Sequence, residues 1–112
     1  MTLNELSWSP SEKKVARAAY DKALERALAS IMAEFKRRAN AATTPSEMWE
    51  VEDYLKEQRR DLDRTFDYRY SQLILVFATL IREGYLEETM LAGLSEDKRK
   101  EIRRFLAWHA RQ

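Results

Sequence analysis

The chain has 112 residues, of which 35% are charged, and these charges almost cancel to a net +1. It contains two glycines, two prolines, one histidine and no cysteine. Globular proteins carry about 7% glycine and about 5% proline, so this chain lacks the turn residues that sandwiches, barrels and doubly wound sheets need. The same counts exclude a dinucleotide-binding glycine motif, a Walker loop, a disulfide framework, a zinc cluster and a thiol nucleophile. We therefore predict one all-α domain over residues 1–112, with no enzymatic activity and no cofactor or metal.

The sequence also predicts a cytoplasmic protein. No apolar run reaches the length of about 18 residues that is typical of a membrane-spanning helix. The first eight residues, MTLNELSW, do not combine a basic segment with a following apolar stretch, so we predict no signal peptide. The lack of cysteine is compatible with a reducing compartment.

A strong helix-start signal stands near the beginning of the chain. Ser9 is a capping residue, Pro10 suits the first helical position, and Glu12 completes a capping box. Apolar residues then recur at helical spacing from Val15 to Phe35. This pattern predicts a first helix of about 28–30 residues that ends near residue 40.

The same signal recurs at residues 44–47 (TPSE) and begins a second helix. The next glycine or proline is Gly84, so the stretch between them must be divided. Its first part is amphipathic, whereas residues 73–81 (LILVFATLI) are apolar on nearly all sides, which is typical of a buried helix. We place the bend at residues 67–71, with Asp67 or Ser71 as the cap of the buried helix.

The remaining residues predict two further short helices. Gly84 is placed to end the buried helix as its C-cap. A helical turn follows at residues 86–91, and Ser95 then caps a last helix that runs to about residue 109. Its core face consists of Ile102, Phe105 and Leu106. The predicted architecture is thus a hairpin of two long antiparallel helices (residues 9–67) followed by a head of three short helices (residues 68–112).

Such a hairpin predicts a homodimer. A helix of about 28 residues is about 42 Å long, and two of them form a structure only one layer thick. This layer cannot enclose its own apolar stripes, and the head is too small to cover them. A second copy would complete a four-helix core. Met32, Phe35 and Met48, near the loop end of the hairpin, are the candidate interface residues; the alternative is a monomer with a folded-back head.

Charge is segregated along the chain. Residues 1–44 hold eight basic and five acidic side chains, residues 45–67 hold four and eight, and residues 96–112 hold six and three. The acidic segment is best explained as a solvated face beside the basic first helix. The basic end of the chain leaves a nucleic-acid-binding dimer as an alternative. The small net charge and the lack of interleaved aromatic residues argue against it.

Trp49, Asp53 and Arg59 form a candidate protein-binding surface on the second helix. Trp49 and Asp53 are four residues apart and share a helix face, and Arg59 falls near the same side. A helical tryptophan flanked by an acid and an arginine has the composition of a binding hot spot. The alternative is that Trp49 belongs to the core and that the two charged residues are merely solvated.

Ordered motifs across nearly the whole chain carry a family resemblance. They are Trp8-Ser9, W-x-x-x-D-[FY]-L from Trp49, R-x-x-[IL]-D from Arg59, D-x-R-x-S-x-[LVI]-I from Asp67, V-F-A-x-L-[LI]-x-E-G-x-[LV] from Val76, Asp97-Lys98 and Ile102. None of these motifs is diagnostic alone. Because the motifs occur together in this order and without a gap, the sequence resembles the fluorescence recovery protein family of cyanobacteria.

The resemblance implies an all-helical homodimer of long helices, each chain with a small helical head. It also implies binding to the orange carotenoid protein, chiefly to the C-terminal domain of its light-activated red form. Members speed the return to the orange form and its release from the phycobilisome, which restores antenna fluorescence, and they use no cofactor. Family positions linked to activity match at Trp49, Asp53 and Arg59, and two dimer-interface leucines of the family fall at Met32 and Met48.

Three positions depart from the family pattern. A head phenylalanine linked to partner contact is Leu75 here, a lysine near the C-terminus is Glu101, and a position that is often histidine is Glu52. Leu75 and Glu101 complete the set of predicted partner-binding residues. Because the head is where the family's partner docks, these departures leave a second possibility open. It is a related helical adaptor of a non-photosynthetic bacterium with a different protein partner.

Overall fold

The computed structural model describes residues 7–110, which are helical with no strand among them. The elements are α1 (Pro10–Ala41), α2 (Pro45–Thr65), α3 (Leu73–Arg82), the 3₁₀ helix η2 (Glu88–Leu91) and α4 (Glu96–Ala110). The prediction of an all-α chain is confirmed. Residues 1–6, for which we predict no signal peptide, lie outside the described residues. Within residues 7–110, every helix is too short or too polar to cross a lipid bilayer.

The two long helices begin where the capping signals place them. Ser9 Oγ accepts a hydrogen bond from the Glu12 amide at 3.1 Å, and Glu12 Oε1 accepts one from the Ser9 amide at 3.0 Å, which completes the capping box. At the second start, Thr44 Oγ1 accepts from the Glu47 amide at 3.2 Å. The Glu47 carboxylate accepts instead from the amide of Thr43, at 3.0 Å. Both helix starts thus satisfy backbone donors that would otherwise lack partners.

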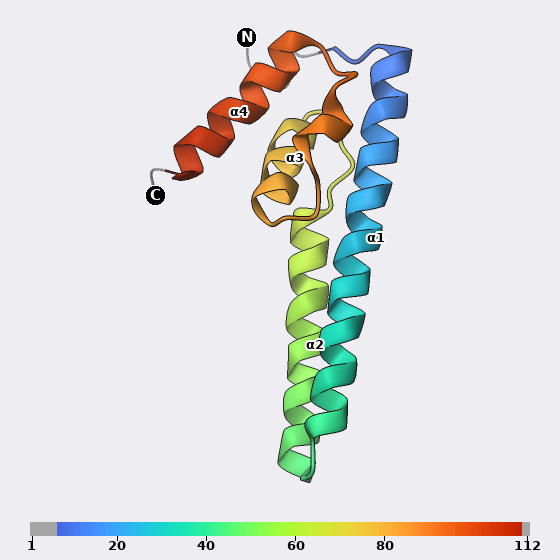
Figure 1. The fold of residues 1–112 in the computed structure, drawn as a ribbon, viewed down its shortest axis with the longest axis vertical. Coiled ribbons are helices and arrows are strands. Elements are labelled where there is room, and N and C mark those ends of the chain that lie inside the picture. Colours follow the sequence, from blue (N-terminus) through green and yellow to red (C-terminus); the bar gives the residue numbers. More distant parts are fainter. Residues whose placement is uncertain (1–6, 111–112) are drawn as a thin grey trace.

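Helices α1 and α2 lie side by side in opposite directions, with the head at the far end from their connecting loop (Figure 1). No residue of α2 is buried. The face that the pair leaves open includes large apolar side chains that are exposed, namely Leu28, Met32, Met48 and Leu55. Among residues 7–110, the buried core therefore lies at the head end.

Helix α3 forms the centre of that core, as its apolar sequence predicts. Leu73, Ile74, Phe77 and Leu80 are each at most 1% exposed. The core continues onto α1 through small residues together with one tyrosine, namely Ala16, Ala19, Tyr20, Ala23 and Ala27. Alanine side chains let neighbouring elements approach the helix backbone closely. The larger apolar residues of α1 thus stand at the edge of this core or in solvent.

The bend between α2 and α3 is present, but the predicted cap of α3 is wrong. Gln72 occupies the cap position, and no side chain hydrogen-bonds there. Its backbone is already helical, with φ −109° and ψ −14°, whereas a capping side chain needs extended backbone. The Asp67 carboxylate instead accepts from Arg69 Nε at 2.8 Å. Tyr20 of α1 holds the bend by packing edge-on against the rings of Phe66 and Tyr68.

Gly84 ends α3 as predicted. Its φ of +85° lies in the left-handed region that favours glycine. The Gly84 amide donates to the Ile81 carbonyl at 3.0 Å, and the Tyr85 amide donates to the Leu80 carbonyl at 2.9 Å. These two bonds form a Schellman motif, which turns the chain sharply after the helix. The turn leads into η2 and then into α4, where Ile102 is buried.

Candidate functional site

Leu75 and Glu101, two of the predicted partner-binding residues, meet in a groove of about 690 Å³ between α3 and α4. We call it the head groove; its other lining residues are Arg104, Phe105, Ala107, Trp108 and His109. Leu75, Phe105 and the 55%-exposed Trp108 supply apolar surface. Glu101 accepts a hydrogen bond from Arg104 Nη1 at 2.8 Å, so both charges at this rim are paired. The head groove thus offers apolar surface with a polar rim, as protein-binding sites do.

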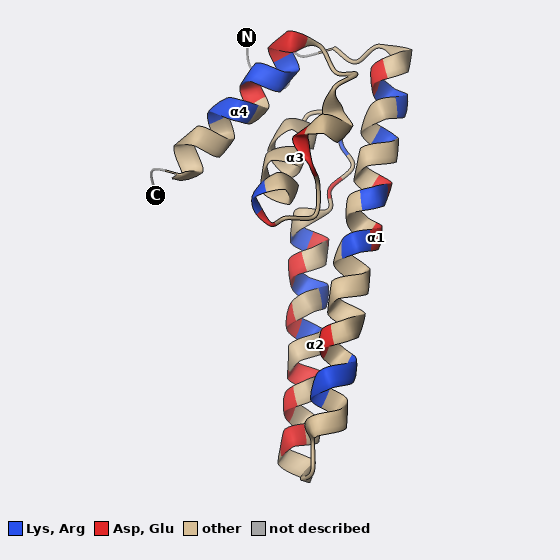
Figure 2. Cartoon of the chain, in the orientation of Figure 1, with Lys and Arg blue, Asp and Glu red and all other residues tan. Residues whose placement is uncertain are grey.

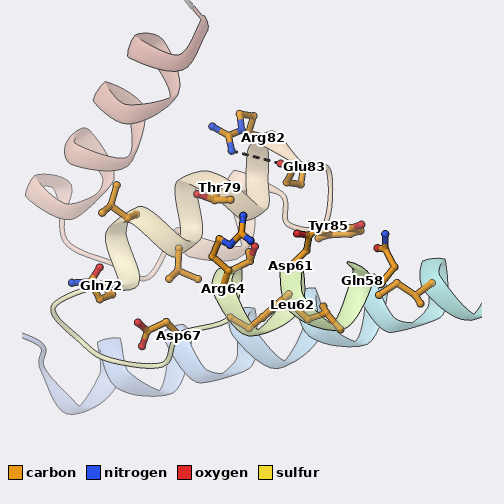
Figure 3. A pocket seen from close by; sticks show the side chains of 15 residues that line it. Gln58, Asp61, Leu62, Arg64, Asp67, Gln72, Thr79, Arg82, Glu83 and Tyr85 are labelled. Atoms are coloured by element: carbon orange, nitrogen blue, oxygen red, sulfur yellow. Dashed lines mark ion pairs between the residues drawn. The ribbon is translucent and has the colours of Figure 1, made fainter. Parts of the chain in front are cut away.

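Leu75 also borders a more polar cleft of about 650 Å³ between α3 and the end of α2 (Figure 3). Arg64 reaches from α2 toward α3, and Arg82 pairs with Glu83 at 3.6 Å. Asp61 and Asp67 also line the cleft. Within residues 7–110, no group of three or more His, Cys, Asp or Glu side chains is placed to hold a metal ion. The cleft therefore offers mixed charge for hydrogen bonding at the edge of the head groove.

Trp49, Asp53 and Arg59 all lie exposed on α2. Trp49 is 57% exposed, so the alternative that it belongs to the core of the chain is wrong. Asp53 lines a groove of about 440 Å³ together with Tyr54 and with Arg38 of α1. The Arg38 guanidinium stacks 4.2 Å from the centre of the Tyr54 ring, which fixes that wall of the groove. Neither Trp49 nor Arg59 lines this groove.

The surface on α2 and the head groove lie far apart along the chain. Trp49 is near the start of α2, sixteen positions before Thr65 at its end, which is roughly 24 Å of helix. The molecule measures 54 Å along its longest axis. The structure thus separates the five predicted partner-binding residues into two surfaces.

The candidate dimer residues lie on the open face of the long helices. Phe35 and Met48 line a shallow groove of about 340 Å³ whose walls are almost entirely apolar, with Val51 and Leu55 beside them. Met32 and Met48 are 57% and 52% exposed. Apolar side chains gathered in this way on a surface mark an interaction site.

A buried ion pair in the head is the feature that sequence patterns did not indicate. Lys98 Nζ lies 3.1 Å from Glu12 Oε2, and both side chains are almost fully buried. Burial raises the pKa of Glu12, but hydrogen bonds from the Ser9 and Ser95 amides and from Lys98 outweigh burial and lower it to about 2. Glu12 belongs to the capping box and Lys98 to the Asp97-Lys98 motif, yet nothing in their spacing predicts that the two side chains meet.

This pair also bears on the alternative of a nucleic-acid-binding dimer, which rests on the basic end of the chain. Lys98 is 4% exposed and faces Glu12 instead of solvent. The neighbouring arginines are also paired with acids, namely Arg99 with Glu96, Arg103 with Glu88 and Glu96, and Arg104 with Glu101. Figure 2 shows acidic residues along α2 with basic ones among them, and alternating charges on the first half of α4. These pairings leave less positive charge for phosphate groups than the sequence implies.

Comparisons with known proteins agree on one family. The family described as photoprotection regulator fluorescence recovery protein matches residues 8–106. The fluorescence recovery protein of Synechocystis sp. PCC 6803 is 33% identical over 99 residues, which are 88% of this chain and 91% of that protein.

Solved structures give the same result. The fluorescence recovery protein of Fremyella diplosiphon is 37% identical and superposes with a TM-score of 0.85, covering 90% of this chain and 98% of its own. The Synechocystis structure is 34% identical, with the same TM-score and coverage. The family is one of regulators by description, not of enzymes. Because sequence and fold agree over nearly the whole chain, this protein belongs to the fluorescence recovery protein family of photoprotection regulators.

Proposed function

We propose that this protein binds the photoactivated orange carotenoid protein, chiefly its C-terminal domain, and accelerates its return from the red to the orange form. This activity would end photoprotective quenching at the phycobilisome in the cytoplasm. The observation that carries the proposal is the match to a photoprotection regulator family over residues 8–106. Similarity of 33–37% to fluorescence recovery proteins supports it.

A protein without catalytic groups can speed a conformational change by binding alone. It must bind the transition state of the change more tightly than the starting state, and it must distinguish the two end states in order to shift their populations. Two separate surfaces suit this task, because they can hold two parts of an opened partner at once. The head groove supplies apolar contact at one end, and Trp49, Asp53 and Arg59 supply a polar and aromatic contact on α2.

The protein acts as a homodimer in this proposal. Residues 9–67 form the dimerising part and residues 68–112 form the head. The exposed apolar face around Met32, Phe35 and Met48 supports this arrangement, since the chain itself leaves that face uncovered. A second copy is the simplest cover, because two such pairs of helices make a four-helix core.

The departures at Leu75, Glu101 and Glu52 favour a second candidate function. The first two lie directly in the head groove. A phenylalanine-to-leucine change reduces the apolar area there, and a lysine-to-glutamate change reverses a charge. A related adaptor from a non-photosynthetic bacterium would use the same scaffold for a different protein partner. Nucleic acid is disfavoured as a ligand because four basic residues of α4 are engaged in ion pairs.

The decisive experiment is a recovery assay. Orange carotenoid protein is converted to the red form by light, and its decay to the orange form is followed in the dark with and without this protein. We expect the decay to accelerate in proportion to the amount added. An unchanged decay together with no binding to the red form would overturn the proposal in favour of the adaptor. Steep loss of DNA binding with added salt would instead indicate a nucleic-acid-binding protein.

A further inference from the structure

Two motifs at opposite ends of the sequence come together at one place in the head. Lys98 and Glu12 are 86 positions apart in the chain, and the lysine Nζ lies 3.2 Å from Glu12 Oε1 and 3.1 Å from Oε2. The same ammonium group donates to the carbonyl of Ser7. It also stands 4.9 Å from the centre of the Trp8 ring, a favourable cation–π position. The ammonium group of Lys98 therefore has partners on several sides.

The Glu12 carboxylate is bound to the starts of two helices at once. Its Oε1 accepts from the Ser9 amide at 3.0 Å, which belongs to the capping box of α1. Its Oε2 accepts from the Ser95 amide at 2.8 Å, and Ser95 directly precedes α4. A carboxylate near the start of a helix is further stabilised by the helix dipole. Glu12 thus links the start of α1 to the start of α4 through hydrogen bonds to both of its carboxylate oxygens.

Helix α4 extends away from this link toward the head groove. Lys98 lies in its first turn, whereas Trp108, which lines the groove, lies near its other end. The two residues are ten positions apart, which is about 15 Å of helix, so a tilt of about 10° at the link moves Trp108 by roughly 3 Å. Glu101 and Phe105 lie between these two points and move with it. The width of the head groove therefore depends on how the start of α4 is held.

We propose that Glu12 and Lys98 are positioning residues for the head groove, fixing the direction of α4 so that Leu75 and Trp108 face the partner at a set separation. The role of the groove in partner binding rests on the proposed function, whereas the position of α4 does not. The two claims can therefore be tested separately in the same set of variants.

The position of α4 is measured directly by spin labels. The chain has no cysteine, so two introduced cysteines give a unique labelled pair. We choose Ser30→Cys on α1 and Ala107→Cys on α4, both at exposed positions. Labelled chains are diluted with an excess of unlabelled chains, so that only distances within one chain are observed. In the parent we expect one narrow distance distribution, and in Lys98→Met a broadened distribution with a shifted centre.

The charge-swapped double variant separates this role from that of a simple ion pair. Glu12→Lys with Lys98→Glu restores opposite charges but leaves α1 without a carboxylate at position 12. The carboxylate introduced at position 98 can accept only from the Ser95 amide of its own helix, so no carboxylate joins the Ser9 and Ser95 amides. We therefore expect the swap to keep the broadened distribution. Recovery of the narrow distribution in the swap would overturn the proposal, because charge attraction alone would then be sufficient.

Matched controls exclude a general loss of stability. Lys22→Met removes an exposed lysine that pairs with Glu25 at 4.0 Å, and it should leave the distance unchanged. Ile102→Val weakens the core of α4 with the pair intact, so it should lower the melting temperature but keep the distribution narrow. If Lys98→Met loses its head structure altogether, Lys98→Arg and Glu12→Asp decide the question. We expect the first to keep the narrow distribution and the second, whose carboxylate is too short to reach both amides, to broaden it.

The partner assay completes the test. The same unlabelled variants are titrated against photoconverted orange carotenoid protein, and Lys98→Met should bind more weakly than Lys22→Met. Equal binding by the two variants, despite a displaced α4, would overturn the link to the groove. If the parent itself does not bind, the proposed function fails, and the distance distributions still decide whether the pair positions α4.

Discussion

Gly93 lies directly against Val15, on the loop that joins η2 to α4. A Cβ atom on Gly93 would stand 2.6 Å from Cγ2 of Val15, which is closer than such atoms approach one another. The loop therefore packs on α1 with no room for a methyl group. Together with the link between Glu12 and Ser95, this contact places the start of α4 on the first turns of α1.

Gly93→Ala should therefore destabilise the head. Overpacking of a close contact costs about 1–3 kcal/mol, and we expect a loss of this size in the free energy of unfolding measured with urea. The matched test is the same substitution in a Val15→Ala background, where the missing methyl groups leave space for the new Cβ. The cost of Gly93→Ala should then largely disappear. An equal cost in both backgrounds would show that the contact with Val15 is not its cause.

The ion pair between Glu12 and Lys98 predicts a specific dependence of stability on pH. The folded-state pKa of Glu12 is about 2, below the ordinary value of 4.5. The ionised carboxylate therefore contributes fully to the free energy of unfolding above pH 4.5, and this contribution is lost as the pH falls toward 2. Glu12→Gln leaves Lys98 buried without its charge partner, and it should cost about 3 kcal/mol at neutral pH. We expect the difference in unfolding free energy between parent and variant to shrink as the pH is lowered from 5 to 3. A constant difference over this range would contradict the role of the charge.

Substitutions on the open face of the long helices test the dimer. Met32→Glu or Met48→Glu places a carboxylate in the proposed interface, and twofold symmetry places it there twice. We expect the dimer dissociation constant to rise by about two orders of magnitude, since each buried charge costs well over 1 kcal/mol. Light scattering should then report the mass of one chain at micromolar concentration. Met90→Glu, at an exposed methionine of the head, is the control and should leave the dimer intact.

The surface on α2 is tested by Trp49→Ala and Arg59→Leu. Both side chains are exposed, so each substitution should change the free energy of unfolding by less than about 0.5 kcal/mol. If Trp49 is a binding hot spot, its loss costs 2 kcal/mol or more, and recovery of the photoprotein should slow by about tenfold or more at limiting concentrations. Lys36→Leu, an exposed change on α1, is the control for added apolar surface. Recovery at the parent rate in both test variants would remove these residues from the site.

The head groove is tested by restoring the residues that the family resemblance implies. Leu75→Phe enlarges the apolar surface of the groove, and Glu101→Lys reverses the charge at its rim. We expect the double variant to bind cyanobacterial orange carotenoid protein more tightly than the parent, with the aromatic ring contributing about 1 kcal/mol. Weaker binding would show that this groove has adapted to another partner. Unchanged binding would place the contact elsewhere on the head.

Local sequence signals predicted most of the helices. Ser9 and Thr44 act as caps whose hydrogen bonds involve neighbours within a few residues, so their spacing in the sequence determines where helices begin. The apolar segment 73–81 can also be recognised from the sequence as a buried helix, because a helix without a polar face must be buried. The end of α3 at Gly84 follows from the same local logic, since only glycine adopts a positive φ there at low cost.

Contacts between distant segments could not be predicted in this way. Glu12 was recognised as a capping residue, but its second set of hydrogen bonds comes from Ser95 and Lys98 at the other end of the chain. The buried face of α1 could not be identified from the sequence either, because its buried positions are mainly alanines, which carry little hydrophobic signal. The head groove follows from how α3 and α4 pack, and no periodic pattern in the sequence predicts that packing.

The lack of any buried residue in α2 has a thermodynamic consequence. A helix that gains its apolar cover from a second copy follows mass action, so its stability rises with the concentration of the chain. Its amide hydrogens should exchange with solvent faster in dilute than in concentrated solution. Those of α3, which is covered by its own chain, should exchange at the same rate in both. The stability of α2 would then depend on the protein concentration, whereas that of α3 would not.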